Sequence, residues 1–184
     1  MKWTYPGTTL SVELKDAKQI EQQFTAMFLG GGIVLSQVAA ITGLEPYTVQ
    51  NWVKRELLPP PERKRYNMNQ LCRIVIINAL KAALPMEKII LLISYVNGDL
   101  DDDKDDLIDD AKLYFLFVLL ASRAKEGFAA EEWNRFLDNE LSDYTEPVPG
   151  AKQRVKKVLW IMLTAWSASK LQKQAETMLS ELDA

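Results

Sequence analysis

The stretch TGLEPYTVQNWVKRELLPPPERKRY, residues 42–66, carries the strongest structural signal in the chain. Gly43 follows a short apolar-periodic segment, and Pro46 opens the next one. Glycine readily adopts the left-handed conformation that ends a helix, and proline is favoured in the first helical turn. Three prolines at 59–61 then force an extended exit. The stretch therefore predicts a helix-turn-helix, with its first helix beginning near an N-cap at Ser36 and its second running to about Leu58.

The second of these helices has two chemically distinct faces when it is projected at 3.6 residues per turn. The apolar face holds Val49, Trp52, Val53 and Leu57. The polar face holds Tyr47, Gln50, Asn51 and Lys54. Amide side chains can pair with adenine in the major groove, and Tyr and Lys can reach phosphates. We expect the polar face to contact DNA; the plainer alternative is a solvated basic face on a helical bundle.

Basic residues continue beyond this helix and set the charge of the region. We expect the DNA backbone to be held by Arg55, Arg63, Lys64, Arg65 and Tyr66. Arg73 adds a further positive charge on the next helix. Residues 30–97 carry 8 Lys and Arg against 4 Asp and Glu, whereas residues 98–146 carry 5 against 15. Because the whole chain is close to neutral at −3, this asymmetry favours a polyanionic partner for the first segment, namely double-stranded DNA.

Composition excludes several classes of function. The 184 residues include no histidine and a single cysteine, Cys72, so the usual general bases, nucleophile couples and zinc ligand sets are missing. We expect no catalysis, no cofactor and no metal site. The opening MKWTYPGTTLSVELKD lacks the apolar core of a signal peptide. The apolar runs at 113–121 and 158–163 are shorter than the ~20 residues of a membrane span, which predicts a cytoplasmic protein without membrane contact.

Hydrophobic periodicity predicts an all-α chain in three parts. Residues 1–29 contain an amphipathic helix over 11–29, which ends at the glycine run 30–32. Residues 30–97 hold the helix-turn-helix, a short hairpin near 58–67, a long helix capped by Asn67 or Asn69, and a helix between Pro85 and Gly98. Residues 98–184 form a helical domain, with helices at about 107–125, 128–141 and 151–182, for oligomerisation or effector sensing.

The stretch 35–95 resembles a MerR-type winged helix-turn-helix. The matching residues are Thr42-Gly43, Thr48-Val49, Leu57-Leu58-Pro59-Pro60, Arg65-Tyr66, Asn69-Gln70-Leu71 and the run 84–89. The whole chain is also similar to the YkrK-like bacterial family of unknown function. The first resemblance implies a transcriptional regulator that binds double-stranded DNA as a homodimer, with a winged helix followed by a helical bundle.

The sequence departs from the MerR pattern at four places. Gln50-Asn51-Trp52 stand where the pattern has Arg-Tyr-Tyr, and Glu56 replaces the glycine that ends the recognition helix. The wing is shortened to PERKR. An acidic run after Gly98 replaces the dimerisation helix, so the dimer geometry of the family does not carry over.

Other readings of the chain stay open at this point. A protein-interaction adaptor could keep the winged-helix fold without binding DNA, and an excisionase-like protein could bend DNA. The Asp residues between 99 and 110 lie near calcium-loop spacing but lack its glycine and its final Glu. The aromatic residues of the last domain could line a pocket for an apolar effector, although a helical core needs the same residues. These are Tyr114, Phe115, Phe117, Trp133, Phe136, Trp160 and Trp166.

Overall fold

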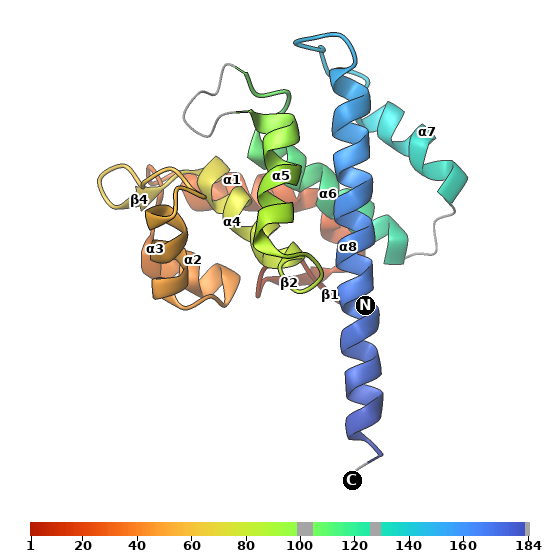
Figure 1. Cartoon of the computed structure of the whole chain (residues 1–184), viewed down its shortest axis with the longest axis horizontal. Coiled ribbons are helices and arrows are strands. Elements are labelled where there is room, and N and C mark those ends of the chain that lie inside the picture. The colour runs from red at the N-terminus through yellow and green to blue at the C-terminus, as the bar shows by residue number, and fades with distance from the viewer. Residues whose placement is uncertain (99–104, 126–129, 183–184) are drawn as a thin grey trace.

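The computed structural model describes residues 1–98, 105–125 and 130–182, and this part of the chain is predominantly helical (Figure 1). The α-helices are α1 (Ile20–Phe28), α2 (Leu35–Thr42), α3 (Pro46–Lys54), α4 (Met68–Leu80), α5 (Met86–Asn97), α6 (Asp110–Lys125), α7 (Ala130–Glu140) and α8 (Ala151–Ser180). The short strands are β1 (Lys2–Thr4), β2 (Ser11–Glu13), β3 (Ile33–Val34) and β4 (Arg65–Tyr66), and a 3₁₀ helix, η1, spans Leu14–Gln19. The predicted all-α class is confirmed at this level.

The N-terminus differs from the prediction of one helix over 11–29. Strands β1 and β2 pair in an antiparallel hairpin that aligns Trp3 with Val12, and the α-helix begins only at Ile20. The hairpin is held by tertiary packing: Trp3 and Tyr5 are buried edge-to-face against each other, with ring centroids 5.6 Å apart. The prediction of a helix from residue 11, and of no strand outside the wing, is therefore wrong.

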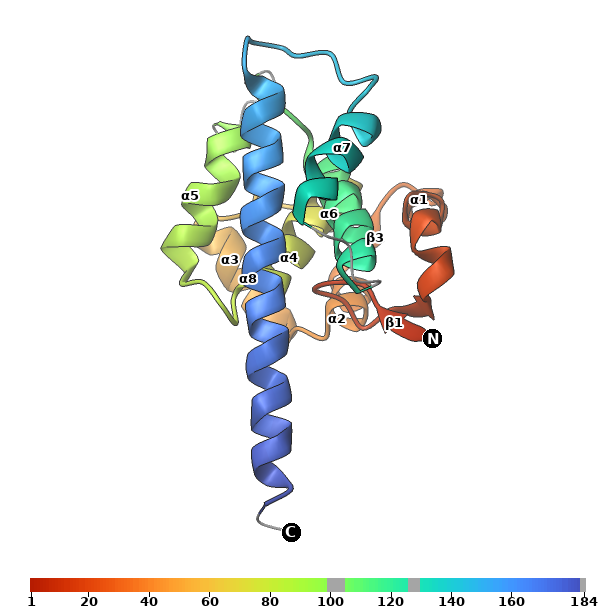
Figure 2. The same ribbon diagram turned by 90° about the vertical axis from the view of Figure 1, so that its right-hand side faces the viewer.

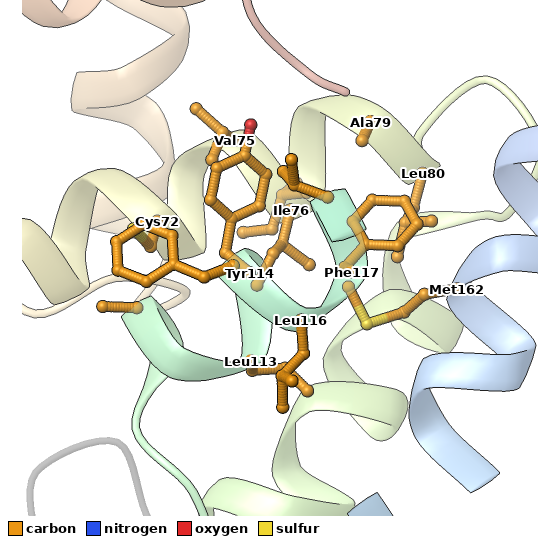
Figure 3. Close-up of a cluster of buried hydrophobic side chains, with 14 of the residues drawn as sticks. Cys72, Val75, Ile76, Ala79, Leu80, Leu113, Tyr114, Leu116, Phe117 and Met162 are labelled. Carbon is orange, nitrogen blue, oxygen red and sulfur yellow. The ribbon is translucent and has the colours of Figure 1, made fainter. Parts of the chain in front are cut away.

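Helix α4 is the centre of the hydrophobic core (Figure 3). Its side chains meet those of α6 and α8, and the labelled cluster comprises Cys72, Val75, Ile76, Ala79, Leu80, Leu113, Tyr114, Leu116, Phe117 and Met162. The buried Tyr114 hydroxyl donates a 2.8 Å hydrogen bond to the Pro6 carbonyl, which ties the N-terminal hairpin to α6. One core therefore joins elements from the beginning, middle and end of the chain.

A buried polar cluster also links α4 to α6. The Arg73 Nε lies 2.7 Å from the Asp110 Oδ2, and the Asn97 Nδ2 donates to the Asp110 Oδ1 at 3.0 Å. The Ala111 N–H donates to the Asn69 Oδ1 at 3.1 Å. Arg73 is only 5% exposed, so the expectation that it adds charge to a DNA-binding surface is wrong. Its charge is neutralised inside the protein by a carboxylate 37 residues away.

Local capping sets the helix boundaries. The Asn67 Oδ1 accepts from the Gln70 N–H and the Gln70 Oε1 from the Asn67 N–H, both at 2.8 Å, so Asn67 rather than Asn69 caps α4. Ser36 is not an N-cap, because α2 begins at Leu35 and the Gln37 side chain accepts from the Val34 N–H. Helix α3 ends at Lys54, earlier than predicted.

Helix α8 packs on α5 and α6 with its first half, while its second half projects beyond the other elements (Figure 2). Among the described residues, no helix combines the length and apolar character needed to cross a membrane.

Candidate nucleic-acid interface

Helices α2 and α3 and strand β4 gather at one end of the molecule, away from α7 and α8 (Figure 1). The turn between α2 and α3 has the expected chemistry. Gly43 has a φ of 69°, and its N–H donates to the Ala39 carbonyl at 2.8 Å. Leu44 is buried beneath the turn, and Pro46 opens α3. The predicted positions of Gly43 and Pro46 are confirmed.

Helix α3 presents the two faces that its sequence predicts. Val49 and Trp52 are buried, while Val53 and Leu57 are half-buried against the core. On the other side Tyr47 is 70% exposed, and Gln50 and Lys54 are also exposed. Asn51 is half-buried at the edge of this face. Tyr47, Gln50 and Lys54 are therefore the side chains of α3 that can reach a ligand without rearrangement.

The end of α3 contains a strained residue. Glu56 has a φ of 57°, in the left-handed region, which costs a residue with a Cβ about 1–2 kcal/mol. This is the position where the MerR pattern has glycine. The conformation is imposed from both sides: the Glu56 N–H donates to the Val53 carbonyl, and the Leu57 N–H donates to the Trp52 carbonyl.

The segment after the prolines is a tight β-hairpin. Glu62 and Arg65 face each other across it, and the Arg65 N–H donates to the Glu62 carbonyl at 2.8 Å. Arg63 and Lys64 form the two-residue tip with φ values of 48° and 64°. Two consecutive positive φ angles are typical of a type I′ turn, which favours Asn-Gly. Here the two tip residues are instead Arg and Lys, and both side chains are exposed.

Two sets of hydrogen bonds fix the hairpin to the body. The buried Gln70 side chain donates from Nε2 to the carbonyls of Pro59 and Pro60, at 3.1 and 3.0 Å. Strand β4 pairs with β3, and the Arg65 guanidinium donates to the Gly32 carbonyl at 2.8 Å. Gly32 has a φ of 101°, and a Cβ there would lie 3.0 Å from the Tyr66 carbonyl oxygen.

The roles of Gln70 and Gly32 in fixing the hairpin were not predicted from the sequence. Gln70 was noted only as part of the MerR pattern, and Gly32 as part of a glycine run that ends a helix. The missed signal for Gln70 is its spacing of three from Asn67, which is the pattern of a capping box.

Tyr66 does not lie where it was predicted to act. The ring is only 3% exposed, because β4 pairs Tyr66 with Ile33 and turns its side chain inward. Burial raises the pKa of its hydroxyl, since the phenolate would lose hydration. The expectation that Tyr66 holds a phosphate is therefore wrong. Its side chain packs in the core beneath β4 and supports the hairpin there. Arg55, Arg63, Lys64 and Arg65 are exposed.

An open cleft of about 850 Å³ lies behind the hairpin, between its basic strand and the first turns of α4 and α6. Its charged lining residues are Arg63, Arg65 and Arg73, and Glu62, Asp106 and Asp110. The cleft therefore combines both charge signs in equal number, so it has no surplus of positive charge to attract a polyanion. This arrangement favours the outer surface of the hairpin for DNA, not the cleft.

The remaining sequence candidates fall mostly in the core. Of the seven aromatic residues considered for an effector pocket, five are buried, Phe136 is half-buried, and Trp160 is exposed. Trp133 and Trp160 line a groove of about 450 Å³ with Lys156 and Lys157. Burial, and then the nearby Asp110 and Asp109, raise the pKa of the Cys72 thiol well above its ordinary value; the thiolate needed for redox chemistry is thereby disfavoured.

In the described part of the chain, no group of three or more His, Cys, Asp or Glu is placed to hold a metal ion. The calcium-loop spacing noted for 99–110 falls mainly on residues 99–104, which lie outside the described residues.

In a comparison with known proteins, part of the chain is similar to a domain without an assigned activity. Residues 33–117, somewhat under half of the chain, match the model of a domain of unknown function, DUF1836. The chain matches no curated protein and no solved structure. The matched segment runs from β3 into α6, so it includes the helix pair, the hairpin and both partners of the Arg73–Asp110 ion pair.

Proposed function

We propose that this chain is a DNA-binding transcriptional regulator in which β3, α2, α3, the 62–65 hairpin and α4 act as a MerR-like winged helix-turn-helix. The observation that carries the proposal is the basic hairpin tip, which lies at the same end of the molecule as α3 (Figure 1). Arg63 and Lys64 occupy backbone conformations that ordinarily select Asn and Gly. Strained conformations of this kind persist where the surrounding structure enforces them, and they cluster at functional sites.

Each part has a distinct role in the proposed complex. Helix α3 enters the major groove, where the Gln50 amide can pair with a base edge and Tyr47 and Lys54 can reach the flanking phosphates. The hairpin tip lies against the backbone next to that groove and contributes Arg63 and Lys64. Trp52 and Tyr66 are buried, so they support these surfaces without touching DNA.

Salt dependence tests the electrostatic part of the proposal. Lys54, Arg55, Arg63, Lys64 and Arg65 are the available cations, and five phosphate contacts give a slope of log K against log salt of about −4.5. Fluorescence anisotropy with labelled duplexes of randomised sequence, between about 50 and 300 mM salt, measures this slope. Arg63→Ala/Lys64→Ala is the test variant, and Lys157→Ala is its control, because Lys157 is an exposed cation on α8, remote from the interface.

A second pair of variants separates base reading from backbone binding. Lys54→Ala should weaken binding to all duplexes alike. Gln50→Ala should instead reduce the preference for the duplex that the wild type binds best, by about 1–3 kcal/mol. A folded protein that binds no duplex at the lowest salt would refute the regulator proposal. Retention of a protein partner by the Arg63→Ala/Lys64→Ala variant would then favour the adaptor alternative.

A further inference from the structure

The second half of α8 has no covering element in the described part of the molecule. Every residue from Lys170 to Leu182 is exposed, and Figures 1 and 2 show this arm projecting clear of the other helices. Eleven of these residues, Lys170 to Ser180, are helical and span about 16 Å. The arm continues the packed half of α8, but none of its own side chains is buried, so packing within the chain does not stabilise it.

The arm carries an exposed stripe of small and apolar residues at strict heptad spacing. Alternate steps of three and four residues connect Ile161, Thr164, Ala168, Leu171, Ala175 and Met178 in α8 and reach Leu182, two residues past the last helical residue; we call this series the α8 seam. Its large members are well exposed: Leu171 by 67%, Met178 by 60% and Leu182 by 80%. A period of 3.5 residues sustained over three heptads is typical of a coiled coil.

The α8 seam lies on the face of the helix opposite the one that packs in the core. Leu159, Met162 and Trp166 are buried against the body, whereas Ile161 and Thr164, in the same turns, are exposed. The seam therefore begins on the outer surface of the body and continues without interruption along the arm. Helix α8 can hold its place in the core and bind a partner at the same time.

We propose that the α8 seam pairs with the same seam of a second copy of this chain, as an antiparallel two-stranded coiled coil. In this alignment Ala168 faces the partner's Met178, and Leu171 faces the partner's Ala175. Every central layer then joins one small and one large residue, which gives even packing. A parallel alignment would set Ala168 against the partner's Ala168 and leave gaps in two layers.

Charge along the arm favours the same arrangement. Lys170 lies nearer the body, and Glu176 and Glu181 lie nearer the tip; Lys173 lies at the midpoint of the pair, on the outer surface. Antiparallel pairing brings the acidic tip of one arm beside the basic base of the other, whereas parallel pairing aligns like charges. The seam itself contains no charged residue. The arm is therefore complementary to a reversed copy of itself.

Sedimentation equilibrium of the full chain, from about 1 to 100 μM, tests the pairing; we expect a dimer within this range. Leu171→Asp places a charge between apolar layers and should weaken the dimer at least about 100-fold. Lys173→Asp is the matched control, because it puts the same residue two positions away on the outer surface and should leave the dimer intact. A wild-type chain that stays monomeric throughout, or equal effects of both variants, would overturn the proposal.

Cysteine cross-linking tests the orientation, and the fully buried Cys72 gives little background. We expect a mixture of Ala168→Cys and Met178→Cys chains to cross-link between the two positions. Ala168→Cys alone should not cross-link, because ten helical residues, about 15 Å, would separate its two thiols. Efficient cross-linking of Ala168→Cys alone would overturn the antiparallel arrangement. The inference does not rest on DNA binding, and loss of the dimer and loss of DNA binding are measured separately.

Discussion

The hairpin tip combines two properties that oppose each other: its backbone conformation favours Asn-Gly, while its side chains are Arg and Lys. The double variant Arg63→Asn/Lys64→Gly removes both charges and supplies the residues that the turn prefers. We therefore expect it to unfold at a higher temperature than the wild type and to bind DNA more weakly. A change that merely damaged the fold would lower both quantities.

The gain in stability follows from the left-handed backbone. A residue with a Cβ costs about 1–2 kcal/mol there, and glycine offsets part of this gain by losing about 0.5–1 kcal/mol of chain entropy on folding. The net gain for Lys64→Gly is thus about 0.5–1 kcal/mol, and Asn in place of Arg63 adds a few tenths because it tolerates this region. For a chain of this size, about 1 kcal/mol raises the unfolding midpoint by about 2–4 °C.

The loss in binding follows from counterion release. Removing two of five phosphate contacts changes the salt slope from about −4.5 to about −2.7. Between about 50 and 200 mM salt the wild-type affinity should then fall about 500-fold, and that of the variant about 40-fold. Thermal unfolding by circular dichroism and anisotropy titration at four salt concentrations measure the two effects on the same samples.

Glu56→Gly provides the control for this prediction. Glu56 has a φ of 57°, so glycine should stabilise the fold by a similar amount, while the removal of an acidic side chain should leave the affinity for DNA equal or higher. The reasoning is refuted if the hairpin variant keeps the wild-type salt slope, or if its stability falls while that of Glu56→Gly rises.

Three further predictions follow from the body of the fold. Arg73→Leu should lower the unfolding free energy by about 3–5 kcal/mol in urea titrations, because it leaves Asp110 buried without its cation. Gly7→Ala should destabilise by more than about 3 kcal/mol in the same assay, because its Cβ would lie 2.0 Å from the Val75 carbonyl oxygen and its φ is 74°. Burial, and then Asp16, raise the pKa of Tyr5 to about 12. The stability due to its protonated hydroxyl is complete below the unfolded pKa of about 10 and is lost as pH rises towards 12, so Tyr5→Phe should flatten the decline in unfolding free energy over that range.

The sequence predicted best the features that depend on neighbouring residues. The turn at Gly43 and the start of α3 at Pro46 are local effects of backbone conformation, and both lie where expected. The separation of Val49 and Trp52 from Tyr47 and Gln50 needs only the helical period. Left-handed backbone at Glu56 was foreseeable from the glycine that the MerR pattern has there.

The failures concern residues whose environment is set by distant segments. Arg73 looked like surface charge because its partner, Asp110, is the last residue of an acidic run that the sequence suggests is solvated. Strands β1 and β2 have three residues each, and no periodicity is measurable over that length. Tyr66 is turned inward by pairing with β3, a two-residue strand that begins right after the glycine run.

A continuous series of contacts joins the hairpin to the second half of the chain. The carbonyls of Pro59 and Pro60 are held by Gln70, in the first turn of α4. One turn later, Arg73 is paired with Asp110, at the start of α6. Because Gln70 and Arg73 are both buried on a rigid helix, a shift of α6 would have to break the ion pair or move the first turn of α4. The position of the basic tip is thus set by an element that follows the acidic run, and a fragment that ends at residue 97 would leave Arg73 with no counter-charge in the core.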